Sequence, residues 1–168
     1  MSDVKDSRQV VEVITSRMVS FLENELGVVV DSKHIYLRDV PLINLGYLTT
    51  LVSMDGHISA LFVFTYDKPL IETVFTKYTE GIDIAENERD IYLEECAGEI
   101  INTVIGNATR DLEQKDSLLT FSPPVVLKEA KNLIKKKNAK FFNAEIHTES
   151  GTLNLFYIVP KDAVKESR

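Results

Sequence analysis

The sequence predicts a mixed α/β fold of the α+β class, in which an antiparallel-rich sheet packs against two long helices. Residues 7–27 and 88–113 show the three-and-four spacing of apolar residues that is typical of amphipathic helices. Each of these segments is followed by strand-like runs that are separated by turn residues. Each half of the chain is therefore expected to hold one long helix and three strands, and residues 1–168 are expected to form one domain with a polar tail from about residue 161.

The composition is that of an ordinary globular protein, with 44% hydrophobic and 27% charged residues among 168. The formal net charge of -7 argues against a nucleic-acid partner, because such proteins place Lys and Arg against phosphates. The single cysteine, Cys96, has no disulfide partner in the chain, and no run approaches the roughly 18 apolar residues of a membrane span. We expect no membrane association, and the N-terminus, which lacks a signal-like apolar stretch, favours the cytoplasm.

In the first half, the helical pattern is expected to stop at Gly27. A β-rich stretch, residues 28–40, follows. Two further strand-like runs, 42–54 and 57–66, are joined by Asp55-Gly56, a hairpin signal because both residues tolerate positive φ.

The middle of the chain predicts two helices. A short helix is expected after Asp67, a candidate N-cap, with Gly81 just beyond its end. The second long helix is expected from about Glu88 to Glu113.

The last third predicts strands again, at residues 117–127, 139–149 and 152–160, with the final turn at Glu149-Ser150-Gly151. Residues 128–138 are compatible with a short helix or with a charged loop.

The second long helix divides cleanly into two faces at about 100° per residue. Apolar residues gather on one face: Leu93, Ala97, Ile100, Ile101, Val104, Ile105, Ala108 and Leu112. Polar residues gather on the other: Glu95, Glu99, Asn102, Thr103, Gly106, Thr109, Arg110 and Glu113. Because Glu99 and Asn102 are three residues apart, their side chains can reach one partner together.

Two glycines accompany this polar stripe, Gly106 within it and Gly98 at its flank. A glycine inside a helix costs about 1 kcal/mol relative to alanine. The bare backbone is interpreted as clearance for another surface, whereas the alternative is a solvated face with incidental glycines.

The two long helices can be compared directly by laying Glu12-Val-Ile-Thr15-Ser16 over Glu99-Ile-Ile-Asn102-Thr103. The acid and the second isoleucine repeat, which is compatible with a duplication. The first helix has Thr15 where the second has Asn102.

The sequence resembles the CheC/CheX/FliY family of chemotaxis phosphatases, and its CheX branch most closely. The resemblance rests on "EIINTVIGNA", which carries Glu-x-x-Asn on a helix, on the prolines of "FSPPVVL", and on the repeated layout of helix plus three strands. The family proline corresponds to Pro123 or Pro124, with Pro124 preferred. Glu95 stands where the family often has Asp or Ser. Only the second helix carries the motif, so the resemblance implies one active helix per chain.

The resemblance implies that the chain dephosphorylates the phospho-aspartate of a CheY-like receiver domain. Asn102 would orient the attacking water, and Glu99 would pair with the receiver's lysine. Glu95, Gly98, Thr103, Gly106 and Pro124 would contact the receiver. The resemblance also implies a homodimer formed through the sheets, no cofactor in this chain, and Mg²⁺ held by the receiver.

The remaining reactive side chains are expected to be structural. His34, His57 and His147 are scattered along the sequence, which disfavours a metal site in this chain. Cys96 falls towards the apolar face and is interpreted as a buried small hydrophobe. Two alternatives to an enzyme remain: a binding module of the same fold that docks on a receiver or on the flagellar switch without catalysis, and a dimeric scaffold.

Overall fold

The structure, a computed structural model, describes residues 2–36, 42–56, 59–112, 119–134 and 138–160. The expected polar tail, His57 and Glu113 lie outside the described residues. The described part is built around a seven-stranded sheet with the order β1-β8-β9-β4-β3, in which β5 and β6 both pair with β3. The pairs are antiparallel. Its strands are β1 (Val30–Tyr36), β3 (Leu48–Asp55), β4 (Ala60–Tyr66), β5 (Thr120–Phe121), β6 (Val125–Lys128), β8 (Ala139–Thr148) and β9 (Gly151–Pro160).

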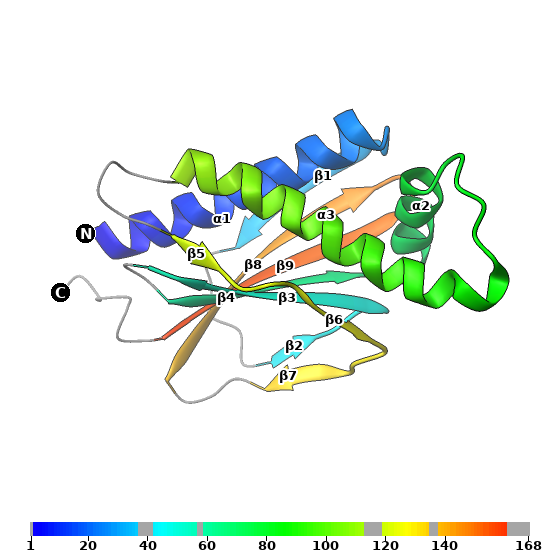
Figure 1. The fold of residues 1–168 in the computed structure, drawn as a ribbon. Coiled ribbons are helices and arrows are strands. Elements are labelled where there is room, and N and C mark those ends of the chain that lie inside the picture. Colours follow the sequence, from blue (N-terminus) through cyan, green and yellow to red (C-terminus); the bar gives the residue numbers. More distant parts are fainter. Residues whose placement is uncertain (1, 37–41, 57–58, 113–118, 135–137, 161–168) are drawn as a thin grey trace.

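The helices cover one face and one end of this sheet (Figure 1). The first is α1 (Ser2–Ser20), which continues into a π-helical turn at Phe21–Glu25. The long α3 (Arg89–Leu112) follows a short 3-10 turn and packs beside α1. The shorter α2 (Lys68–Tyr78) lies at the end of the sheet. On the opposite face lies a two-stranded ribbon of β2 (Leu42–Asn44) and β7 (Asn132–Ile134).

The strand order confirms the predicted repeat of a helix followed by strands. The hairpin β3–β4 belongs to the first half of the chain and the hairpin β8–β9 to the second, and they meet at the β4–β9 pair in the centre of the sheet. The outer strands are exchanged: β1 pairs with β8, and β6 pairs with β3. The mixed α/β fold with an antiparallel sheet and two long helices is therefore confirmed.

Two apolar clusters hold the layers together. The larger one lies between the sheet and the helices and includes Phe62 and Phe64 of β4, which are fully buried. Because side chains alternate along a strand, Val63 points to the other face. There it joins the second cluster, which the ribbon covers: Ile43, Val63, Phe141 and Phe156.

The prediction of a single strand over 117–127 was wrong in one respect, because the described part of this segment is split into β5 and β6. Pro123 and Pro124 lie between the two pieces and have no N–H to donate to a ladder. Ser122 still holds the segment against β3, since its N–H donates to the Ser53 carbonyl oxygen over 2.9 Å.

The segment 128–138, expected as a short helix or a charged loop, forms neither along Asn132–Ile134. These residues pair with β2 as β7, and Leu133 packs against the second cluster. A three-residue strand is too short to show a period, and its partner is distant in sequence. The pairing is therefore set by the tertiary contact and not by local propensity.

The predicted turn and cap residues are confirmed where the structure describes them. Gly27 has φ of 62° at the end of the first helical segment, a conformation that favours glycine. The side chain of Asp67 caps α2 by accepting from the Leu70 N–H over 2.9 Å. Glu149 and Ser150 form the two-residue turn between β8 and β9.

Gly46 is constrained by a close approach of the backbone. A Cβ on Gly46 would lie 2.3 Å from the carbonyl oxygen of Tyr66. The chain passes so close to β4 that only glycine fits between β2 and β3.

Among the described helices, none is long and apolar enough to cross a membrane.

Asp67 offers a test of how the end of the sheet is held. Its second carboxylate oxygen accepts from the Thr152 N–H over 2.8 Å, so one side chain joins α2 to β9. We expect Asp67→Ala to lower the free energy of unfolding by about 2 kcal/mol, because the cap is lost and the Thr152 N–H loses its acceptor. Urea denaturation measures this, with Asp83→Ala in the exposed α2–α3 connection as control, expected within about 0.5 kcal/mol of the parent. An Asp67→Ala variant as stable as this control would contradict the assignment.

Candidate functional site

The outward face of α3 carries the predicted polar stripe. The apolar face is buried as expected through Leu93, Ala97, Ile100, Ile101, Val104, Ile105 and Ala108. On the opposite side Glu95, Glu99, Asn102, Thr103 and Gly106 are exposed, and Gly98 is half-buried. The rotation of α3 therefore presents Glu99 and Asn102 together to solvent.

The start of α3 is held by charged contacts to two other elements. Lys128 of β6 donates to the carboxylate of Asp90 over 2.8 Å, and this hydrogen bond lowers the pKa of Asp90. Arg89 pairs with Glu72 of α2 and lies over the ring of Phe75, with 5.0 Å between the guanidinium carbon and the ring centroid. These contacts join α3 to β6 on one side and to α2 on the other.

Two surface hollows meet at Asn102. The first has a volume of about 520 Å³ and is lined by Glu94, Glu95, Gly98, Glu99, Asn102, Pro124 and Val126. The second has a volume of about 410 Å³ and is lined by Val52, Asn102, Ile105, Gly106, Thr109, Phe121, Ser122 and Pro123. The side chain of Asn102 thus stands between an acidic hollow and a more apolar one, in front of the interruption between β5 and β6.

Most of the predicted site residues come together around these hollows. Glu95, Gly98, Glu99, Asn102 and Pro124 line the acidic hollow. Gly106 lines the second hollow. Pro123 lines the second hollow together with Asn102. Pro124 lines the acidic hollow together with Asn102 and Glu99.

Thr103 does not line either hollow. Its hydroxyl donates to the carbonyl oxygen of Glu99 over 3.0 Å. Its exposed position on the stripe is as predicted, although its side chain is turned to its own helix.

The two helix glycines are not required by packing within the described chain. A Cβ on Gly106 would meet no described atom within 4 Å, and one on Gly98 would lie in ordinary contact, 3.9 Å from Val126. Gly106 and Gly98 thus leave unfilled space on the surface beside Glu99 and Asn102.

Tyr78, at the end of α2, is a neighbour of the site that sequence reasoning missed. Its pKa is raised first by burial and then by the nearby Cys96 and Glu99. Its approach to α3 depends on how two helices pack, which no local pattern indicates. Cys96 itself is buried, as predicted, and burial raises the pKa of its thiol to about 12.

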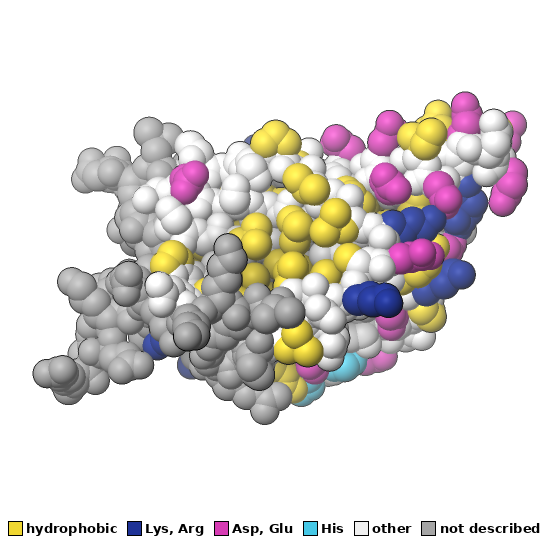
Figure 2. Space-filling view, turned by 90° about the horizontal axis from the view of Figure 1, so that it is seen from below, with side chains coloured by type: hydrophobic (Ala, Val, Ile, Leu, Met, Phe, Trp, Pro, Cys, Tyr) yellow, Lys and Arg dark blue, Asp and Glu magenta, His cyan; other side chains and the backbone are white. Residues whose placement is uncertain are grey.

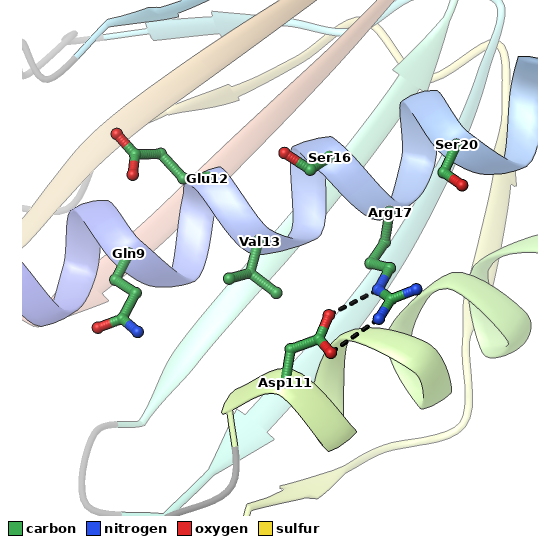
Figure 3. Close-up of a pocket in the computed structure, with 7 residues that line it drawn as sticks. All are labelled: Gln9, Glu12, Val13, Ser16, Arg17, Ser20 and Asp111. Carbon is green, nitrogen blue, oxygen red and sulfur yellow. Dashed lines mark hydrogen bonds and ion pairs between the residues drawn. The ribbon is translucent and has the colours of Figure 1, made fainter.

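The matching segment of α1 presents a different surface (Figure 3). Thr15, which aligns with Asn102, is fully buried, and Glu12 pairs with Arg8 of its own helix over 2.6 Å. Arg17 reaches across to Asp111 at the end of α3 with bonds of 2.6 and 2.7 Å, and this pairing lowers the pKa of Asp111. The face of α1 therefore has no exposed amide in the place of Asn102.

The histidines are less scattered than the sequence indicated. His34 of β1 and His147 of β8 lie with ring centroids 6.1 Å apart, and His147 contacts Glu145 over 3.3 Å. Sheet pairing brings them together, which their sequence separation hides. Across the described ranges, no group of three or more His, Cys, Asp or Glu side chains is placed to hold a metal ion.

Comparison with known proteins identifies the family. Residues 48–147 match the family model described as chemotaxis phosphatase CheX. The chain belongs to the CheX family. The matched range contains both strands of the β3–β4 hairpin, all of α3 and the prolines. Among curated proteins, none matches the chain.

Solved structures of CheX proteins share the fold. A CheX from Desulfovibrio desulfuricans is 14% identical, with a TM-score of 0.73 over 89% of this chain and 98% of that one. CheX from Vibrio vulnificus is 18% identical, with a TM-score of 0.68 over 89% and 95% of the two chains. A Borrelia burgdorferi chain solved as a CheX–CheY–BeF₃–Mg²⁺ complex is 17% identical, with a TM-score of 0.67 over 88% and 95%.

The open space at Gly106 yields a prediction on stability. We expect Gly106→Ala to raise the free energy of unfolding by about 1 kcal/mol, because alanine favours the helix and its methyl group meets open space. Gly46→Ala is the matched contrast and should be destabilising, because its methyl group would overlap the Tyr66 carbonyl. Urea denaturation of both variants measures the difference, and a destabilised Gly106→Ala protein would refute the account of that position.

Proposed function

We propose that this CheX-family chain is a phosphatase that accelerates hydrolysis of the phospho-aspartate of a CheY-like receiver domain. The observation that carries the proposal is the exposed pair of Glu99 and Asn102 beside an open hollow on the outward face of α3. Membership of a family described as chemotaxis phosphatases supports the reaction type. The Borrelia burgdorferi complex of a CheX with CheY supports the choice of partner.

The reaction needs few groups from this chain. Water attacks the phosphorus atom, the bond between phosphorus and the aspartyl oxygen breaks, and the products are inorganic phosphate and the receiver's free carboxylate. In this proposal the receiver holds Mg²⁺, which neutralises charge on the phosphoryl oxygens. The phosphatase then has to place a water in line with the breaking bond.

Asn102 is proposed to hold that water. A carboxamide oxygen accepts a hydrogen bond from water, and its nitrogen donates to a phosphoryl oxygen. Being uncharged, the side chain approaches an anion without repulsion. Its position between two hollows leaves room on both sides for the receiver's active-site loops.

Glu99 is proposed to pair with the receiver's lysine. A carboxylate facing the phosphoryl group would be repelled, whereas a pairing with lysine is a charge-assisted hydrogen bond that also sets the docking register. Glu95 and Pro124, which line the same hollow, would contact the receiver beside it. Thr103, Gly98 and Gly106 complete the proposed contact, and the glycines provide the clearance.

A non-catalytic module of the same fold would use the same surface. It would bind a phosphorylated receiver or a flagellar-switch component without changing the receiver's rate of dephosphorylation. The exposed amide of Asn102 favours the enzyme, because binding alone would not need an uncharged group at the phosphoryl position.

Asn102→Ala separates these two functions. We expect the variant to bind the receiver but to lose about tenfold or more of the acceleration, because the water is no longer positioned. Loss of phosphoryl group from a ³²P-labelled receiver measures the rate. Asn107→Ala is the matched control, since Asn107 lies on the same helix about 140° away around its axis. Full acceleration by Asn102→Ala would contradict the mechanism.

We also propose that the chain forms a homodimer through its sheet. Strand β1 is an edge strand, and edges must be paired or covered. Hydrophobic side chains gather on the helix-free face (Figure 2), where Val125 and Leu42 are exposed. Sedimentation velocity should give twice the 19.0 kDa chain mass at rising concentration, and a mass of one chain at every concentration would refute the dimer.

A further inference from the structure

Large apolar side chains are exposed at the start of α3. Ile91 is 61% exposed and Tyr92 is 39% exposed, and Tyr78 at the end of α2 is also 39% exposed. Exposed side chains of this size that lie together mark interaction surfaces more often than isolated ones do. These three residues are called the N-terminal patch.

The patch continues the stripe that carries the candidate site. Ile91 precedes Glu95 by four residues, and Tyr92 precedes Glu99 by seven, so all four lie on the outward side of one helix. Tyr78 belongs to α2, which packs against α3. The apolar face of α3 points the other way, into the core. Ile91 and Tyr92 therefore do not serve the packing of this helix.

Several acidic side chains lie near the patch in the sequence. Glu86, Glu88, Glu94 and Glu95 are all exposed. In Figure 2 acidic side chains gather at the end of the molecule where Figure 1 places α2 and the start of α3, with hydrophobic and basic ones among them. A partner surface that covers this patch would be apolar at its centre and basic at its rim.

The dimensions place the patch inside a normal docking footprint. At a rise of about 1.5 Å per residue, Ile91 lies about 12 Å along the helix from Glu99. A standard interface covers about 800 Å² on each partner, which is a disc of about 16 Å radius. A receiver centred near Glu99 and Asn102 would thus cover the N-terminal patch as well.

We propose that the receiver docked at Glu99 and Asn102 also binds the N-terminal patch, and that this contact selects the receiver. The partner is a receiver whose surface, about 12 Å from the lysine that meets Glu99, carries an apolar group flanked by Lys or Arg. This inference rests on the proposed function. Binding strength and choice of receiver come from the patch, and the chemistry comes from Asn102.

The test measures binding and rate separately. Fluorescence anisotropy gives the affinity of the full chain for each of a panel of purified CheY-type receivers loaded with beryllofluoride and Mg²⁺. Ile91→Ser and Tyr92→Ser should each weaken binding to the preferred receiver by about tenfold, because a truncated central contact typically costs that much. The dephosphorylation rate at saturating chain should stay as in the parent.

The matched control is Val29→Ser. Val29 is 53% exposed and precedes β1, at the edge of the sheet opposite β5 and β6, so its loss should leave receiver affinity unchanged. Added salt should weaken binding of the parent chain if the acidic rim meets basic residues.

The outcomes distinguish this inference from the proposed function. If Ile91→Ser and Tyr92→Ser both bind the receiver as tightly as the parent, the proposed role of the patch is overturned. The phosphatase proposal still stands in that case, provided that Asn102→Ala slows dephosphorylation. Weakened binding by these variants, in a chain that never accelerates dephosphorylation, would support the patch and refute the phosphatase. Binding that added salt does not change would overturn the basic rim of the partner. A parent chain that binds no receiver of the panel would overturn both proposals.

Discussion

The burial of one face of α3 is the interaction on which the arrangement of the candidate site depends. Eight apolar side chains of this helix are buried, from Leu93 to Ala108. Burying each large side chain contributes about 1.5–3 kcal/mol to stability. A rotation of the helix about its axis would expose several of them and lose the burial free energy of each. This constraint alone is enough to point Glu99 and Asn102 outward.

The second constraint is the missing N–H groups of Pro123 and Pro124. A continuous strand would have run beside α3 along the edge of the sheet, whereas the prolines divide it into β5 and β6. The interruption faces Asn102, and the two hollows open on either side of it. Together with the bare backbone at Gly98 and Gly106, it leaves space that the described chain does not fill. The free energy that these glycines cost the helix is small beside the burial of its other face.

The sequence predicted those features that depend on local periodicity or on a single residue's backbone preference. The faces of α3, the cap at Asp67 and the turn before Gly151 are of this kind. Two other features depend on contacts between distant segments: the pairing of β7 with β2, and the position of Tyr78 near α3. No local sequence pattern indicated either of them. The same holds for His34 and His147, which the pairing of β1 with β8 brings together. The motif of Glu99 and Asn102 was readable because both residues lie on one helix.

The most direct test of the account is a crystal structure of this chain with a CheY-type receiver loaded with beryllofluoride and Mg²⁺. We expect the Asn102 carboxamide to lie within hydrogen-bond distance of the beryllofluoride or of a water beside it. We also expect the Glu99 carboxylate to contact the receiver's lysine. A receiver seated on the β2–β7 ribbon or along β1, with Asn102 left in solvent, would contradict this expectation.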